Sequence, residues 1–60
     1  MTTVKYSRAK LIEMLNDVDN DSAMDQDEII IEIGDGYLSF YQASHYPIDA
    51  PKHFLGRIFE

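Results

Sequence analysis

Cysteine and tryptophan are absent from this sequence, and basic residues are few. Without cysteine the chain has no disulfide, no thiol nucleophile and no thiolate zinc site, and its composition fits a reducing compartment. Five lysines and arginines stand against eleven aspartates and glutamates, which gives a net charge of −6 at pH 7. Because such a field repels phosphate groups, we expect no direct binding to nucleic acid or to membranes.

Long hydrophobic runs are also absent. No apolar run approaches the roughly 18 residues of a membrane span, and the basic residues near the N-terminus are not followed by the apolar region of a secretory signal. We therefore expect a cytoplasmic protein. A chain of 60 residues hides only about 60% of its unfolded surface on folding, so its core must be small. The sequence predicts one small acidic domain over residues 1–60.

The spacing of the apolar residues changes along the chain and predicts an α+β fold. Ser7 suits a helix N-cap, and the apolar residues that follow recur at helical spacing. This pattern predicts one amphipathic helix over about residues 7–20. Residues 2–6 alternate polar and apolar, which favours a short edge strand, and a longer helix beginning at Thr3 is the alternative. The apolar face of the predicted helix comprises Leu11, Ile12, Leu15 and Val18.

Two β-prone runs flank a Gly-Asp-Gly turn and predict a β-hairpin over about residues 28–42. A two-residue turn at Asp35 and Gly36 sets the register, because each residue before the turn then has one partner after it. The apolar face of this hairpin is expected to pack against the helix. The predicted pairs are Ile33 with Leu38, Ile31 with Phe40 and Ile29 with Gln42, and the predicted core is Leu11, Leu15, Ile31 and Phe40.

The end of the chain is predicted to form a short C-terminal helix. Asp49 suits its N-cap, and Pro51 falls in the first turn, where a missing N–H does no harm. The segment before it is expected to be irregular, because Pro47 restricts itself and its neighbour. The sequence thus predicts a small two- or three-stranded antiparallel sheet packed against the first helix, with the C-terminal segment closing an edge. The helical stripe of this segment is Phe54, Leu55, Ile58 and Phe59.

The most specific motif is the acidic run from Asp17 to Glu28, which resembles an EF-hand calcium loop. Ser22 stands where that loop has glycine, and a β-branched run replaces the exiting helix. The alternative, which we favour, is a solvated connection whose Asp and Asn residues form turns. The resemblance implies calcium ligands at Asp17, Asp19, Asp21, Asp25 and Glu28, with the carbonyl of Ala23.

No residue pattern points to catalysis. His45 and His53 belong to no closely spaced ligand pair, and no serine lies in a nucleophile elbow. The glycine-bearing turn is too short for a phosphate-binding loop. We therefore expect a protein that is not an enzyme and that needs no cofactor, with calcium as the one alternative.

The outward face of the hairpin is more aromatic than a solvated sheet face needs to be. Tyrosine is enriched at interface hot spots, because it buries a large rigid surface and keeps a polar hydroxyl. The alternative is that the C-terminal segment covers this face and makes it a second core. The predicted partner-binding residues are Tyr37, Tyr41, Glu32 and Ile30.

Small size and the lack of catalytic groups favour a protein-binding accessory or regulatory factor that acts through a partner protein. In size and composition the chain is similar to the accessory proteins of bacteriophages and other mobile elements, a likeness that no particular residue carries. One alternative is a calcium-binding module, and another is a nucleic-acid mimic that inhibits a DNA- or RNA-binding protein. A homodimer joined through residues 2–6 or through the tyrosine face is also compatible with the small core.

Overall fold

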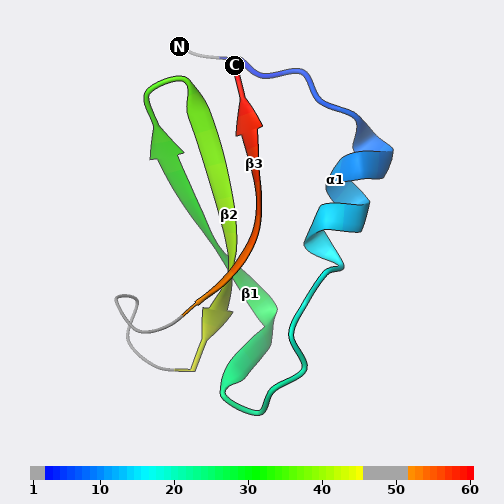
Figure 1. The fold of residues 1–60 in the computed structure, drawn as a ribbon, viewed down its shortest axis with the longest axis vertical. Helices are drawn as coiled ribbons and strands as arrows, with labels where there is room; N and C mark the ends of the chain where they lie inside the picture. The colour runs from blue at the N-terminus through cyan, green and yellow to red at the C-terminus, as the bar shows by residue number, and fades with distance from the viewer. Residues whose placement is uncertain (1–2, 46–51) are drawn as a thin grey trace.

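The computed structural model describes residues 3–45 and 52–60, which form one helix and a three-stranded antiparallel sheet (Figure 1). The strand order β1-β2-β3 places each strand beside its neighbour in sequence. The predicted small α+β fold is confirmed, with three strands in the sheet. In the described ranges no helix is long and apolar enough to cross a membrane. The elements are α1 (Arg8–Leu15), β1 (Met24–Gly34), β2 (Tyr37–Ser44) and β3 (His53–Phe59).

Helix α1 begins where the sequence predicts. Ser7 is the N-cap, and its side-chain Oγ accepts a hydrogen bond from the Lys10 N–H at 3.3 Å. This bond satisfies one of the amide donors that the first turn of a helix leaves unpaired. Residues 3–7 form neither the predicted edge strand nor the first turn of a longer helix.

The helix ends at Leu15, earlier than the predicted end near Asn20. Beyond it, the side chains of Asp19 and Asp21 accept hydrogen bonds from backbone N–H groups two residues further on, at 3.0 and 2.9 Å. Such local bonds offer the backbone an alternative to the helical ladder, which is why aspartate favours turns over helix interiors. The predicted helix was too long: it is capped at Asn16, and the aspartates beyond the cap form turns instead of further helical turns.

The hairpin has the predicted register: all three predicted pairs are present, and Gly34 pairs with Tyr37 across the turn. Gly36 has φ 82°, whereas no described residue other than glycine has a positive φ. The turn therefore has a positive φ at its second central position, as a type II turn requires. The ladder continues beyond the predicted range to Met24 and Ser44, with an irregularity between Met24 and Ile29.

The predicted C-terminal helix is wrong, because His53–Phe59 form strand β3 beside β2. Its proposed cap Asp49 and Pro51 lie outside the described residues. The hairpin offers an open edge, and pairing with it satisfies backbone groups along the segment. A register shift opposite Phe40 and Tyr41 accommodates one extra residue in β3 and leaves Leu55 buried.

The core lies between α1 and the β2–β3 half of the sheet, where α1 runs beside β3 (Figure 1). Met14 packs directly on Gly56 of β3, where a Cβ atom would overlap the methionine side chain. Ile12, which the sequence placed on the buried face, is exposed. The buried cluster is Phe40, Leu55 and Ile58, with Val4, Leu11, Met14, Leu15 and Leu38 packed against it.

Ile31 is not in this core, contrary to the sequence prediction. Its side chain is 52% exposed, although it pairs with the buried Phe40. Ile29 and Ile33 on the same face are 41% and 79% exposed. These three residues lie on the same face of the sheet as Phe40, but α1 lies over β3 and leaves β1 uncovered.

Candidate functional site

The four predicted partner-binding residues lie together on the face of the sheet opposite α1. Ile30 pairs with Tyr41, and Glu32 pairs with Ser39 of β2. Because cross-strand partners share a face and side chains alternate along a strand, Tyr37 points to the same side. We call this surface the outer face. It comprises Ile30, Glu32, Tyr37, Ser39, Tyr41, Lys52, Phe54, Arg57 and Phe59.

Strand β3 widens the outer face. Phe54 pairs with Tyr41, and their rings meet edge to face with centroids 5.4 Å apart. Phe59 pairs with Tyr37, and both phenylalanines are exposed. The described part of the C-terminal segment therefore extends the tyrosine face sideways and does not fold over it.

Two cations lie on the aromatic rings of this face. The guanidinium of Arg57 lies 4.9 Å from the centroid of Tyr37, and its Nε donates a hydrogen bond to the buried Ser39 Oγ at 2.6 Å. The ammonium of Lys52 lies 4.3 Å from the centroid of Tyr41. Both distances are within the range of cation–π attraction, which is about 6 Å. The outer face is thus aromatic and locally basic in an otherwise acidic protein.

Sequence reasoning missed Arg57 and Lys52 because residues 52–59 were predicted to be helical. In a helix, Arg57 has no reason to face Ser39. Their meeting depends on the pairing of β2 with β3, and these strands end and begin too far apart in the sequence, at Ser44 and His53, for a two-residue turn to set the register. The one usable signal was the open edge of the predicted hairpin, which called for a third strand.

The Tyr37 ring is held by contact with the backbone across the turn. It lies so close to Gly34 that a Cβ atom at this position would overlap the ring. A glycine opposite an aromatic residue in a sheet is commonly covered in this way. Gly34 therefore has a packing role as well as a place beside the turn.

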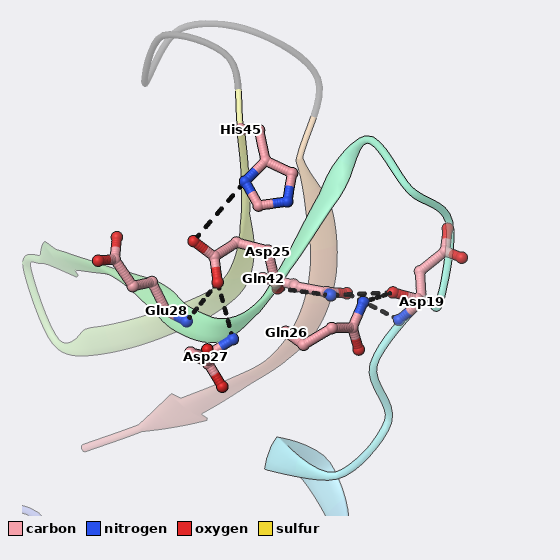
Figure 2. Close-up of polar contacts among 7 residues, drawn as sticks. All are labelled: Asp19, Asp25, Gln26, Asp27, Glu28, Gln42 and His45. Carbon is pink, nitrogen blue, oxygen red and sulfur yellow. Dashed lines mark hydrogen bonds and ion pairs between the residues drawn. The ribbon is translucent and has the colours of Figure 1, made fainter.

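The acidic run from Asp17 to Glu28 forms a second surface, which we call the acidic surface. The buried side chain of Gln42 holds it by hydrogen bonds to its backbone (Figure 2). The Gln42 side chain is 1% exposed, and its Nε2 donates to the carbonyl oxygens of Asp19 at 3.0 Å and Asp25 at 2.8 Å. Its Oε1 accepts from the Asp19 N–H at 2.7 Å. Gln26 Nε2 also donates to the Asp19 carbonyl, at 2.8 Å. The connection after α1 is thereby tied to both β1 and β2.

The carboxylates of this surface accept hydrogen bonds from nearby backbone groups. One oxygen of Asp25 accepts from the N–H groups of Asp27 and Glu28 at 2.8 and 3.2 Å. The other oxygen lies 4.0 Å from the His45 Nδ1, as Figure 2 shows. These bonds hold the irregular start of β1 with Asp25 partly buried, whereas Asp27 and Glu28 are exposed.

The five predicted calcium ligands are divided between a connection and a strand, because β1 begins at Met24. In the part of the chain that the structure describes, no group of three or more histidine, aspartate or glutamate side chains is placed to hold a metal ion. Calcium binding by this run stays a prediction.

Comparison with known proteins identifies no relative. No family model matches the chain, and no curated protein or solved structure matches it. The outer face and the acidic surface are therefore the features from which a function can be inferred.

Proposed function

We propose that this chain is a small acidic protein-binding factor, accessory or regulatory in role, that docks onto a partner protein through its outer face. The observation that carries the proposal is the gathering of four aromatic side chains on one side of a thin sheet. Three of these rings have a cation over them, and the two phenylalanines are 50% and 69% exposed. The four are Tyr37, Tyr41, Phe54 and Phe59.

The chemistry of this face suits a protein interface. Aromatic residues and arginine dominate binding energy at interfaces, where they are buried without losing much conformational freedom. Arg57 is already oriented by Ser39 and by two rings, so less side-chain entropy is lost when a partner covers it. Residues that are ordered before binding make the better anchors.

The acidic surface supports binding in a different way. Its exposed carboxylates attract a basic partner from a distance and so raise the association rate more than the final affinity. The Gln42 bonds hold this surface in one shape. A partner that fits both surfaces has an apolar or acidic centre for the outer face and a basic flank for the acidic surface.

The proposal is tested with a partner captured from the native lysate by the immobilised protein and identified by mass spectrometry. Tyr41→Ala is expected to weaken equilibrium binding by roughly 30-fold or more, because truncating a hot spot costs about 2 kcal/mol. The protein should remain folded. Ile12→Ala is the matched control, since Ile12 is exposed on α1, away from the outer face.

A second variant separates the two surfaces. Asp25→Asn with Asp27→Asn should slow association chiefly at low salt and leave dissociation nearly unchanged. Asparagine keeps an oxygen that can accept the Asp27 and Glu28 amide hydrogens, so the backbone turn is preserved. Normal binding by Tyr41→Ala, together with loss of binding at all salt concentrations in the neutralised variant, would contradict the proposal in favour of a mimic or a metal site.

A further inference from the structure

The open edge of the sheet can be located from one hydrogen bond at the hairpin. The Glu60 N–H donates to the Gly36 carbonyl at 2.9 Å, on the side of β2 where β3 lies. Backbone groups alternate in direction along a strand, so the odd-numbered residues 37–41 of β2 face β1. Their partners, the even-numbered residues 30–34, face β2. The N–H and C=O groups of Ile29, Ile31 and Ile33 therefore point to the open edge.

The same three isoleucines have exposed side chains, at 41%, 52% and 79%. They lie on the face of the sheet that carries Phe40, in β1, the edge strand farther from α1 (Figure 1). The stretch is bounded by the irregularity between Met24 and Ile29 on one side and by the turn on the other. An open backbone edge that also carries a continuous apolar stripe is a template for pairing with another strand.

We propose that this edge pairs with the same edge of a second copy of the chain, joining two sheets into one six-stranded sheet around a two-fold axis at Ile31. In this arrangement Ile31 faces Ile31 of the second copy, and Ile29 faces Ile33. The six isoleucines then form one apolar surface on the α1 side. The interface is self-complementary, as a two-fold dimer requires.

The charges on β1 select this register over its neighbours. Over residues 28–34, centring on Ile31 places each Ile30 opposite Glu32 and each Glu28 opposite Gly34 of the second copy, so no carboxylate faces another in this stretch. A register shift of two residues is the smallest shift that keeps the isoleucine faces of both copies on the same side of the joined sheet. A slide in one direction places Glu28 opposite Glu32, and a slide in the other places Glu32 opposite itself. Like charges directly opposite each other destabilise a sheet.

Salt should favour this dimer. Each chain carries a net charge of −6, so two copies repel each other at long range, and added salt screens that repulsion. The dimer fraction should rise between low and physiological ionic strength. Binding of a basic partner to the acidic surface would show the opposite dependence, so the two kinds of association are distinguishable.

The proposal is tested by sedimentation of the full chain and of two charge variants at the axis. We expect the wild type to pass from monomer to dimer as its concentration rises. Ile31→Lys and Ile31→Glu should each raise the dissociation constant by roughly 100-fold, because each variant places like charges against one another at the axis. An equimolar mixture of the two variants should dimerise again, because Lys then faces Glu. Only an interface centred on residue 31 predicts this rescue.

The matched control is Ile12→Lys, which adds the same charge at an exposed isoleucine on α1 and should dimerise like the wild type. Circular dichroism verifies the fold of each variant. If the axis variants unfold, Ile29→Lys combined with Ile33→Glu should dimerise, whereas Ile29→Lys combined with Ile33→Lys should not. A wild type that stays monomeric at all concentrations, or a mixture that stays monomeric, overturns the proposal. The dimer places Ile30 and Glu32 at its seam but leaves the aromatic residues Tyr37, Tyr41, Phe54 and Phe59 of the outer face uncovered, so its failure and a failure of the proposed function are separate results.

Discussion

The Gln42 side chain and the Asp19 backbone form a reciprocal pair of hydrogen bonds: the amide oxygen accepts at 2.7 Å and the amide nitrogen donates at 3.0 Å. The side chain thus pairs with the backbone as a neighbouring strand would. Gln42 is among the most deeply buried side chains described, and it links the segment that follows α1 to strand β2. Polar groups at such depth contribute to stability only when all of them are satisfied.

Replacing Gln42 by leucine should lower the free energy of unfolding by about 1–3 kcal/mol, because the change removes three hydrogen bonds at a buried position, although Gln26 still donates to the Asp19 carbonyl. Urea unfolding measures this loss. Gln26→Leu is the control, since Gln26 is exposed and gives Asp19 a single bond. Equal losses in the two variants would show that the buried amide has no special role.

The paired residues Phe40 and Ile31 should respond very differently to truncation. Phe40→Ala should cost about 3–5 kcal/mol, because Phe40 is buried between α1 and β3. Ile31→Ala should cost less than about 1 kcal/mol in dilute protein, because half of the side chain is already in water. Thermal melting of both variants measures the contrast. A large loss in Ile31→Ala at low concentration would mean that α1 covers β1 in solution.

Gly56→Ala should destabilise the fold through Met14. An added Cβ atom would overlap the Met14 side chain, which must shift, and because this side chain is flexible the cost should lie near the lower end of the range of about 1–3 kcal/mol for overpacking. In a Met14→Ala background the overlap is absent, so the same change at Gly56 should cost less. A double-mutant cycle by urea unfolding gives the coupling. Costs that add within about 0.5 kcal/mol would show that α1 does not pack on Gly56.

Calcium should have no specific effect on stability. Several of the candidate carboxylates already accept backbone hydrogen bonds, and the run is divided by the start of β1. A ligand that binds only the folded state raises the melting temperature by mass action. Melting with millimolar calcium should therefore match melting at equal ionic strength in sodium chloride. A saturable rise that is lost in Glu28→Gln would establish the calcium module instead.

Two local signals allowed the first part of the fold to be predicted from sequence. Ser7 has both the side chain and the position of an N-cap, and its bond to Lys10 forms within one turn. The Gly-Asp-Gly turn between β-prone runs determines the hairpin register, because a two-residue turn leaves each residue one partner. The same alternation correctly placed Tyr37 and Tyr41 on one face with Glu32.

The C-terminal segment shows where local signals stop being sufficient. Its apolar residues at 54, 55, 58 and 59 suit a helix, and they equally suit a strand with one extra residue. Strand formation depends on neighbours more than helix formation does, because it needs an edge to pair with. The open edge of β2 decided the outcome, and with it the meeting of Arg57 with Ser39 and Tyr37.

The sequence by itself determined the hairpin, its register and the two faces of its sheet, since these follow from contacts between residues close in the chain. Only the tertiary structure decided which half of the sheet face that carries Phe40 is covered by α1. The helix runs beside β3 (Figure 1), where Gly56 allows close approach of Met14, so it covers the β3 side of the sheet and not β1. The core therefore forms on β2 and β3, and the isoleucines of β1 are left at an open edge.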